Sequence, residues 1–352
     1  MSTILVINPG STSTKFAVFY NDKNVFQQTL RHSSEELSPF PTVASQYEFR
    51  KAVIVKCLET NHIKLDFDII VGRGGILKPM KSGIYAVNNA MKTDLLAATY
   101  GEHACNLGAL IADSLAHEIG CKAIIADPVV VDEMIDVARI SGHPLFPRLS
   151  IFHALNQKAI ARIYAKEHDT TYESLHLIIA HLGGGISVGA HKKGKVIDTN
   201  NALAYGPFSP ERSGTISSSE LAKLCFSGEY TFEQVKKMLN GAGGLVAHLG
   251  INEVHVAVEK AKNGDQKAQL ILNALAYNVA KEIGSMATVL QGAVDAIILT
   301  GGIAHNPSIT QYISDMVQFI APVSVYPGED ELWALAEHGI NALNNSLIQE
   351  YI

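Results

Sequence analysis

The stretch ILVINPGSTSTKFAVF (residues 4–19) decides the fold, because two apolar runs in it flank a short turn of Pro, Gly, Ser and Thr. Short apolar runs bounded by turn residues are typical of buried strands. The same plan returns as LIIAHLGGGISVGAH (177–191). A second echo pairs DIIVGRGG (68–75) with DAIILTGG (295–302), each an apolar run that leads into paired glycines. Two echoes in the same order indicate a duplicated domain.

Helical patterns alternate with these runs, which predicts the α/β class. The clearest helix spans about Gln266–Gln291, with Asp265 as its cap and Gly292 at its end. The echoes predict a first domain over 1–150, completed by a last helix over 333–352, and a second domain over 151–332, with a ligand cleft between the halves. The predicted strands are Ile4–Ile7, Phe16–Tyr20, Asp68–Gly72, Ala123–Asp127, Leu175–Ala180, Ala296–Thr300 and Val323–Tyr326.

Composition excludes several classes of protein. The 352 residues include 28 Lys and Arg against 34 Asp and Glu, for a net charge of −6, so no overall basic field attracts nucleic acid or a membrane surface. The N-terminus carries no signal peptide or membrane span, and we expect a cytoplasmic protein with small-molecule partners. The cysteines are Cys57, Cys105, Cys121 and Cys225. No two of them form a CxxC pair, so the sequence gives no sign of a zinc site or a redox dithiol.

Three glycine loops are candidate phosphate cradles. Gly10–Ser13, Gly183–Gly185 and Gly301–Gly302 each follow an apolar run. Glycine lets the backbone approach a ligand closely, so that successive N–H groups can converge on an anion. For any one loop a plain tight turn is the simpler interpretation, and the strand–turn–strand setting is not that of a P-loop. Three loops at matched positions in two echoing halves favour phosphate binding.

That combination resembles the superfamily of acetate and sugar kinases, Hsp70 and actin, which implies two related domains of the actin-like, ribonuclease H-like type. Within it the chain resembles the acetokinase family, most closely the branch that phosphorylates butyrate. The motifs that carry the resemblance are VINPGSTSTKF (6–16), FHALNQKAIA (152–161), IAHLGGG (179–185), ERSG (211–214), TGGIAHNP (300–307) and PGEDEL (327–332). Departures from the family pattern fall on Ala304 and His305 and on Gly250–Asn252, which leaves the adenine contacts open.

The resemblance implies reversible, ATP-dependent phosphorylation of a short-chain fatty acid, with butyrate or isobutyrate preferred, to an acyl phosphate and ADP. It also implies Mg²⁺ and a homodimer or higher homo-oligomer. A carboxylic acid with a pKa of about 4 to 5 is ionised at neutral pH, so no general base is needed. The reaction needs in-line alignment and positive charge on the transferring group.

Arginines and histidines supply that charge. Arg73 ends an apolar run beside glycines, and Arg212 lies in a loop. The alternative for Arg73 is an ion pair at the domain surface. The alternative for His181 is a structural histidine that caps the end of its strand with its hydrogen bonds made within the protein. Asp127 orients an arginine or metal-bound water, caps a turn, or serves as a base if the acceptor is an alcohol. The catalytic candidates are Arg73, His103, Asp127, His153, His181 and Arg212.

The resemblance also implies nucleotide and metal contacts. Mg²⁺ is expected at Asn8, Asp330 and Glu331, with Glu329 as a competitor. Gly74 and Gly75, in place of bulkier residues, are expected to widen an acyl pocket beside Arg73. The nucleotide-binding candidates are Asn8, Gly10, Ser11, Thr12, Lys15, His181, Gly183, Gly184, Gly185, Gly301, Gly302, Ile303 and Asn306.

Two other functions remain open at this point. A sugar or other alcohol kinase of the same superfamily would use Asp127 as a base and turn over ATP with a polyol. A non-catalytic ATP-sensing module would need a basic patch or a third domain, and the sequence offers neither.

Overall fold

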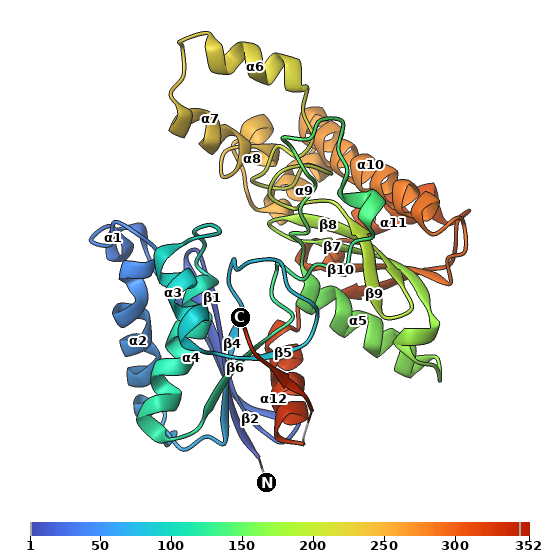
Figure 1. The fold of residues 1–352 in the computed structure, drawn as a ribbon. Helices are drawn as coiled ribbons and strands as arrows, with labels where there is room; N and C mark the ends of the chain where they lie inside the picture. Colours follow the sequence, from blue (N-terminus) through green and yellow to red (C-terminus); the bar gives the residue numbers. More distant parts are fainter. Residues whose placement is uncertain (1, 345) are drawn as a thin grey trace. The chain divides into compact units, whose positions relative to one another are not determined.

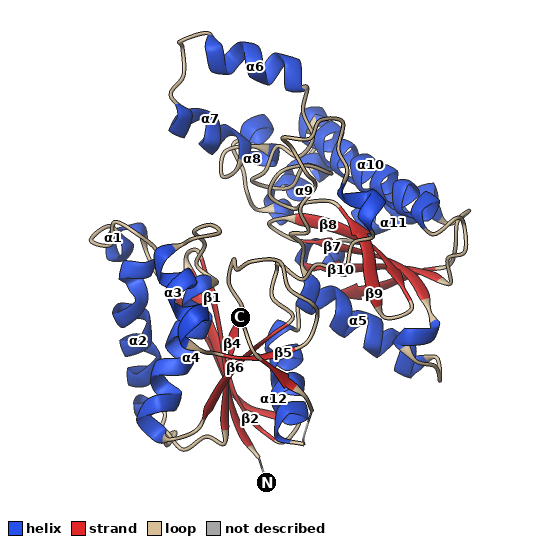
Figure 2. Ribbon diagram, viewed as in Figure 1, coloured by secondary structure: helices blue, strands red, loops and turns tan. Residues whose placement is uncertain are grey.

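The computed structural model describes residues 2–344 and 346–352. Contacts divide the chain into two units. The first unit comprises the residues up to Asp132 together with Asp330–Ile352, and the second comprises Glu133–Glu329. Each unit combines one sheet with helices (Figures 1 and 2), which confirms the predicted α/β class.

Seven strands form the sheet of the first unit, in the order β12-β5-β6-β4-β1-β2-β3. The strands β1, β2 and β3 form an antiparallel meander, whereas β4 runs parallel to β1 and β6 runs parallel to β4. Their bounds are β1 Thr3–Gly10, β2 Ser13–Tyr20, β3 Lys23–Arg31, β4 Ile69–Arg73, β5 Ile84–Ala86, β6 Lys122–Ala126 and β12 Ile348–Gln349.

Five strands form the sheet of the second unit, in the order β11-β10-β7-β8-β9. The strands β7, β8 and β9 form an antiparallel meander, and β10 and β11 are added in parallel to β7. Their bounds are β7 His176–Leu182, β8 Ile186–Lys192, β9 Lys195–Thr199, β10 Ala296–Gly301 and β11 Val323–Pro327.

The two sheets share a five-strand plan. The order β3-β2-β1-β4-β6 in the first unit matches β9-β8-β7-β10-β11 in the second, with the same strand directions throughout. The echoing stretches of sequence are the equivalent strands β1 and β7, and β4 and β10. The repeat inferred from the sequence is therefore confirmed at the level of strand topology.

Helices cover both faces of the first sheet. Figure 1 shows α2, α3 and α4 on one side of this sheet and α12 on the other. A Cβ on Gly339 of α12 would lie 3.0 Å from side-chain atoms of Ile4 and Val71, so this helix packs closely on β1 and β4. The helices of the unit are α1 Ser34–Leu37, α2 Tyr47–Thr60, α3 Asn89–Ala97, α4 Asn106–Ile119 and α12 Glu331–Leu343.

The central strands β7 and β10 of the second sheet are buried on both faces, which explains why they are mostly apolar. Ile178 and Ala180 pack in one cluster with α10, and Leu177 and Ile179 pack in another with α5. The helices of the second unit are α5 Ala154–Glu167, α6 Ser218–Phe226, α7 Phe232–Leu239, α8 Gly244–Leu249, α9 Val254–Lys262, α10 Gln266–Val289 and α11 Pro307–Val317. Among the described residues, short 3-10 helices lie at Ala44–Gln46 in the first unit and at Asp136–Arg139, Tyr172–Ser174 and Gly302–His305 in the second.

All seven strands predicted from the sequence are present, and the Asp265 side chain caps α10 by accepting from the Ala268 N–H at 3.0 Å. The predicted last helix over 333–352 is too long. It ends at Leu343, and the chain then adds β12 in parallel beside β5, because Ile348 and Gln349 find open backbone partners at that sheet edge. Within the described residues no helix is long and apolar enough to cross a membrane.

Candidate functional site

The turn of the β1–β2 hairpin is held by a buried arginine that the sequence analysis missed. Arg50 of α2 is fully buried and donates to the carbonyl oxygens of Gly10 at 2.7 Å, Ser11 at 2.9 Å and Ser13 at 2.9 Å. It also donates to the Thr14 hydroxyl at 3.2 Å. The acceptors of this turn are therefore satisfied from inside the unit, while Ser11, Thr12 and Lys15 are exposed.

The end of β4 carries the polar cluster of the first unit. Arg73 forms an ion pair with Glu331, the first residue of α12, and donates to Asn8 Oδ1 at 3.3 Å. The Asn8 Nδ2 group donates to Glu331 Oε2 at 2.7 Å. Glu331 is only 4% exposed, so its charge is balanced within this cluster. Three predicted site residues are brought together here.

The three neighbouring acidic residues have separate surroundings. Asp330 caps α12, since its Oδ1 accepts from the Trp333 N–H at 3.2 Å. Glu329 belongs to the second unit, where it lies 3.1 Å from His181 Nε2. Glu331 contacts Asn8 and Arg73 in the first unit.

Gly74 and Gly75 are tightly packed, which argues against the interpretation that they leave room for an acyl chain. A Cβ on Gly74 would lie 2.6 Å from Pro128 Cβ, and one on Gly75 would lie 2.5 Å from Asn106 Oδ1 and 2.7 Å from Leu95. The space in front of each glycine is already filled by protein atoms. Close packing, rather than a widened pocket, accounts for the missing side chains.

His103 presents a defined ring nitrogen. Its Nδ1 accepts from the Cys105 N–H at 3.2 Å and lies 3.0 Å from the Cys105 thiol. Burial raises the pKa of Cys105 to about 11, so this thiol stays protonated and also donates. Because Nδ1 is an acceptor, the neutral ring carries its proton on Nε2.

Asp127 follows β6 and is buried among residues of the first unit. It has φ of 38°, a left-handed conformation, and its Oδ1 accepts from the Ser82 hydroxyl at 2.6 Å and the Gly83 N–H at 2.9 Å. His338 of α12 lies 3.3 Å from its Oδ2. These contacts hold the carboxylate in a turn and against α12. They agree with the alternative that Asp127 caps a turn.

Two histidines lie side by side in the second unit. The rings of His153 and His181 stack with centroids 3.8 Å apart and planes 13° apart. His181, at the end of β7, contacts Asn156 Oδ1 through Nδ1 at 2.8 Å and Glu329 Oε1 through Nε2 at 3.1 Å. A Cβ on Gly183 would lie 2.8 Å from Glu329 Oε1 and 2.9 Å from His181 Nε2. Glycine at this position therefore leaves room for the contact between these two atoms.

A cavity of about 370 Å³ in the second unit is lined by five of the thirteen predicted nucleotide-binding residues, which are Gly183, Gly184, Gly302, Ile303 and Asn306. This volume suits a small-molecule ligand. Asn252 and His305, at two of the positions that depart from the family pattern, also line it, and Asn252 donates to Glu211 at 3.0 Å. The lining residues are Gly183, Gly184, Pro210, Asn252, Val254, His255, Gly302, Ile303, His305, Asn306 and Glu329.

The loops around this cavity are joined by backbone contacts. Gly301 has φ of 93° and exchanges two hydrogen bonds of 3.0 Å with Gly328, which ties the loop after β10 to the acidic segment after β11. A Cβ on Gly301 would lie 2.4 Å from Leu182 O. Gly301 therefore serves the backbone arrangement, while Gly302 lines the cavity.

Arg212 lies against the glycine turn of the β7–β8 hairpin. It donates to Ala202 O at 2.9 Å, and burial lowers its pKa. A Cβ on Gly185 would lie 2.0 Å from Arg212 Nη1, so only glycine allows the guanidinium to sit there. The Ser209 hydroxyl donates to Gly184 O at 2.7 Å on the same turn.

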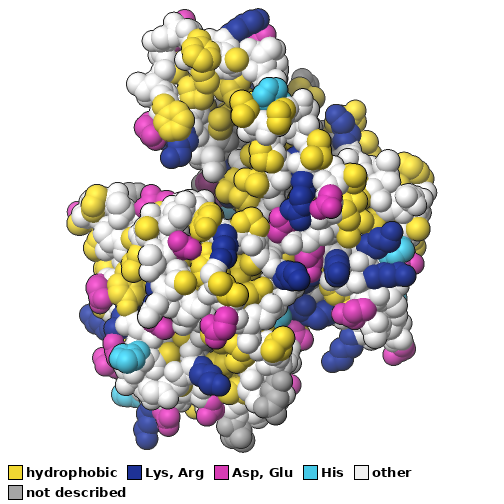
Figure 3. Space-filling view, in the orientation of Figure 1, with side chains coloured by type: hydrophobic (Ala, Val, Ile, Leu, Met, Phe, Trp, Pro, Cys, Tyr) yellow, Lys and Arg dark blue, Asp and Glu magenta, His cyan; other side chains and the backbone are white. Residues whose placement is uncertain are grey.

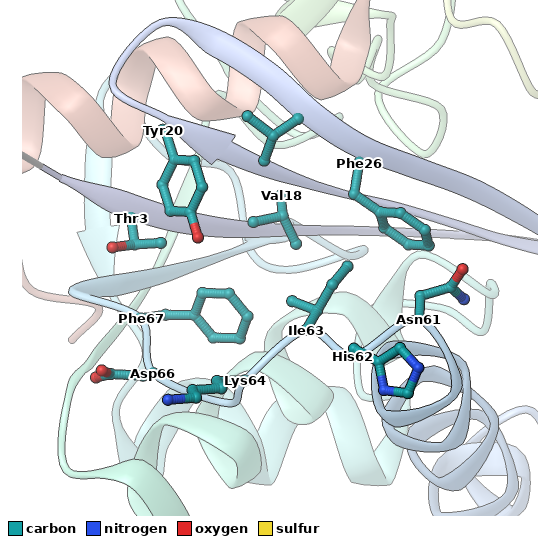
Figure 4. Close-up of a pocket in the computed structure, with 11 residues that line it drawn as sticks. Thr3, Val18, Tyr20, Phe26, Asn61, His62, Ile63, Lys64, Asp66 and Phe67 are labelled. Carbon is teal, nitrogen blue, oxygen red and sulfur yellow. The ribbon is translucent and has the colours of Figure 1, made fainter.

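A separate hollow of about 550 Å³ lies in the first unit (Figure 4). Side chains of β2 and β3 line one part of it and the segment after α2 lines the other. None of the predicted site residues lines this hollow. It is therefore not part of the candidate site.

Several site residues gave no signal in the sequence. Arg50 of α2 and Asn156 of α5 were not predicted as site residues, yet both are buried. Gln157 and Ser187, also buried, hydrogen bond around His153. A helix in which Asn156, Gln157 and Lys158 follow one another and are all buried marks a polar interior that periodicity alone does not reveal.

Oxygen ligands suited to Mg²⁺ are present in the first unit. Among the described residues no group of three or more His, Cys, Asp and Glu side chains could hold a metal ion by itself. Mg²⁺ keeps most of its water and takes few protein ligands. The amide oxygen of Asn8 and the carboxylate of Glu331 fit a metal held mainly through water.

Comparison with known proteins agrees with this architecture. The chain is 54% identical over 343 residues to Butyrate kinase 2 of Clostridium acetobutylicum, covering 97% of this chain and 96% of the relative. It is 54% identical over 346 residues to a probable butyrate kinase of Bacteroides thetaiotaomicron, covering 98% of each. The crystal structure of Porphyromonas gingivalis acetate kinase has the same fold, with a TM-score of 0.79 at 18% identity over 97% of this chain and all of that one.

The model of the acetokinase family matches residues 148–325, which hold β7–β11, the stacked histidines and the glycine loops of the second unit. Together with the full-length relatives this settles the classification. The chain belongs to the acetokinase family, whose members are ATP-dependent kinases of carboxylic acids.

Proposed function

We propose that this chain is a butyrate kinase, which transfers the γ-phosphoryl group of ATP to the carboxylate of butyrate or isobutyrate. The observation that carries the proposal is 54% identity to Butyrate kinase 2 over 97% of the chain. An alcohol kinase and a non-catalytic ATP sensor are not favoured, because relatives of this identity are named as kinases of a carboxylic acid.

The reaction is a single displacement at phosphorus. A carboxylate oxygen forms a bond to the γ-phosphorus, the bond from that phosphorus to the β,γ-bridging oxygen breaks, and ADP leaves with the electron pair. The acid is ionised near neutral pH, so no side chain removes a proton. The protein has to align the two substrates and neutralise the transferring group.

The second unit supplies the nucleotide contacts in this proposal. Its 370 Å³ cavity takes the adenosine part against Gly302–Asn306, and the turn Gly183–Gly185 takes the phosphates. Arg212, fixed by Ala202 and Gly185, stabilises the charge on the transferring group. His153 donates a hydrogen bond to a phosphoryl oxygen, and His181, whose two ring nitrogens contact Asn156 and Glu329, supports the His153 ring by stacking on it.

The first unit supplies the acyl-substrate contacts. Arg73 at the end of β4 faces the substrate carboxylate or the transferring phosphoryl group, and His103 offers Nε2–H as a donor. The turn Gly10–Ser13 and Lys15 contact phosphate. Asp127 acts indirectly, by holding the turn after β6.

Mg²⁺ would be held in this proposal by Asn8 and Glu331 through water, with Asp330 close by in the chain. When bound, the ion supplies positive charge to the phosphate oxygens. The Glu331 carboxylate also pairs with Arg73, so a metal held here would share this carboxylate with Arg73. Removing Mg²⁺ with EDTA should abolish turnover, and full activity without a divalent ion would contradict this assignment.

A homodimer or higher homo-oligomer is also part of the proposal. Phe226 and Phe232, in α6 and α7 of the second unit, are 91% and 77% exposed, and hydrophobic side chains show on this part of the surface in Figure 3. Exposed apolar patches of this kind mark contact surfaces. Light scattering after gel filtration measures the assembly.

Four free cysteines suit a reducing compartment such as the cytoplasm.

The decisive experiment is trapping of the acyl phosphate as a hydroxamate. We expect product with Mg-ATP and butyrate or isobutyrate, less with acetate, and none with glucose or glycerol. Because one methylene in an apolar pocket discriminates by roughly 10-fold to 200-fold, the preference should be clear in kcat/KM. Turnover with a polyol and none with carboxylates would overturn the proposal.

A further inference from the structure

A continuous chain of buried side chains runs behind His153 in the second unit. It links Tyr172, His191, Gln157 and Ser187 to the His153 ring, with heavy-atom distances from 2.7 to 2.9 Å. His191, Gln157 and Ser187 are completely buried. None of these four side chains has a role in the transfer described above, and buried polar networks of this kind are costly unless every group is paired.

The direction of the hydrogen bonds is fixed at Ser187. Gln157 Nε2 lies 3.1 Å from the Ser187 carbonyl oxygen, which can only accept, so the amide nitrogen is on that side. The same nitrogen donates to Ser187 Oγ at 2.9 Å, and the His153 backbone N–H donates to this oxygen at 3.3 Å. Both lone pairs of the hydroxyl oxygen are then used.

The one hydrogen-bonding group of the Ser187 hydroxyl that is still unassigned is its O–H donor. His153 Nδ1 lies 2.8 Å from Ser187 Oγ, so the hydroxyl must donate to that ring nitrogen. The Nδ1 atom is therefore an acceptor, and the proton of the neutral ring is on Nε2.

The hydrogen bonds around His191, at the other end of this series of side chains, run in the same direction. Gln157 Oε1 can only accept, so His191 Nε2, at 2.9 Å, carries a proton. Burial, and then the charge of Lys158, lower the pKa of His191 well below its ordinary value, so its Nδ1 is unprotonated and accepts from the Tyr172 hydroxyl at 2.7 Å. Each donor in the chain points toward His153.

The neutral state of His153 suits its neighbour. Its ring stacks on His181 at 3.8 Å, and the two nitrogens of His181 face Asn156 Oδ1 and Glu329 Oε1. Two cationic rings at that separation would repel each other strongly inside the protein. A neutral ring with its proton on Nε2 can still donate a hydrogen bond to an anionic oxygen.

We infer that Gln157, acting through Ser187, is a positioning residue that locks His153 in the neutral Nε2–H tautomer, so that this ring donates to the transferring phosphoryl group. The inference about the donor's task rests on the proposed function. The tautomer itself is a property of the unliganded protein.

The tautomer can be measured directly on protein labelled with ¹⁵N-histidine. Long-range ¹H–¹⁵N spectra at pH 7.5 should show the His153 ring with a protonated Nε2 and an unprotonated Nδ1, and His153→Gln identifies its signals among the 14 histidines. A ring protonated on Nδ1, or on both nitrogens, would overturn the inference. This spectrum is independent of turnover, so it distinguishes failure of the inference from failure of the proposed substrate.

Gln157→Glu tests the lock with almost no change in shape. An ionised carboxylate still accepts from His191 but cannot donate to Ser187, so the Ser187 hydroxyl should turn to Glu and accept from His153 Nδ1–H. We expect the tautomer to switch and kcat to fall about 100-fold, the order seen when one preorganised donor is lost, with KM for ATP within about 3-fold.

The matched control is Gln269→Glu, the same chemical change on an exposed position of α10, which should leave tautomer and kcat unaltered. If Gln157→Glu does not fold, Ser187→Ala removes the donor to Nδ1 and should give a mixture of tautomers with reduced kcat. Wild-type kcat in the Gln157 variant, or a rise in KM alone, would contradict a positioning role.

Discussion

The β1–β2 and β7–β8 hairpins have the same place in matching sheets but are supported in different ways. In the first, Arg50 takes up the carbonyl oxygens of Gly10, Ser11 and Ser13 from within the unit. In the second, Arg212 lies directly against Gly185 and donates to the carbonyl oxygen of Ala202. Arg50 is built into the scaffold, whereas Arg212 is the one that we propose to act on a ligand. A repeated backbone plan therefore does not imply repeated roles for its charged residues.

The largest effect is expected for Arg50→Met. Several buried acceptors would lose their donor, each at a cost of roughly 1–3 kcal/mol, so the free energy of unfolding should fall by at least about 3 kcal/mol. Urea denaturation measures the loss. The control is Lys56→Met on the exposed side of α2, which should change stability by no more than about 0.5 kcal/mol. A stable Arg50→Met variant would mean that the two hairpins are supported alike.

The second prediction concerns Gly185→Ala in the other hairpin. Because its Cβ would lie 2.0 Å from Arg212 Nη1, the guanidinium must leave its place, and we expect kcat to fall about 10-fold to 100-fold. Steady-state kinetics with butyrate and Mg-ATP gives the effect. Gly284→Ala in α10, where a Cβ meets no atom within 4 Å, should leave kcat unchanged. Equal activity of both variants would show that Arg212 has no part in the transfer.

The third prediction returns to the first unit with Gly75→Val. Overpacking against Asn106 and Leu95 should lower stability by about 1–3 kcal/mol. The ratio of kcat/KM for butyrate to that for acetate should stay within about 3-fold of wild type, because no acyl chain occupies this space. A selective loss of butyrate would restore the pocket interpretation that the packing argues against.

The smallest perturbation is chemical labelling of the thiols. Burial raises the pKa of Cys105 and Cys121, both in the first unit, to about 11, whereas Cys225 in the second unit is exposed. Alkylation requires the thiolate, so at pH 8 limiting iodoacetamide should modify Cys225 first. The rates at Cys105 and Cys121 should rise about 10-fold for each unit of pH up to about 11. Peptide mass spectrometry resolves the order, and early labelling of Cys105 would indicate that the first unit opens readily.

Sequence reasoning predicted the parts of the fold that depend on local pattern. The strands around residues 4–19 and 177–191 were found because apolar runs and turn residues are local signals, and their repetition gave the duplicated topology. The end of the last helix was misplaced, since β12 forms only because an edge of the first sheet is available to Ile348. That edge is a tertiary feature with no trace in the local sequence.

The candidate site was predicted in part. Residues at strand ends, such as Arg73 and His181, could be recognised from their position beside glycines, and the structure places them in polar clusters. The packing argues against the role given to Gly74 and Gly75, because sequence does not tell whether the space in front of a glycine is empty. The supports Arg50 and Gln157 were missed because a buried polar residue in a helix looks the same as an exposed one.

The discontinuous first unit has a consequence for the order in which the protein is made. Its α12 helix packs on β1 and β4, and β12 completes the sheet edge, yet both are translated after the whole of the second unit. During synthesis the apolar face of β1 and β4 stays exposed to solvent until roughly the last two dozen residues have left the ribosome. The second unit is continuous and can fold in the meantime, so the half of the molecule that begins the chain is the last to be finished.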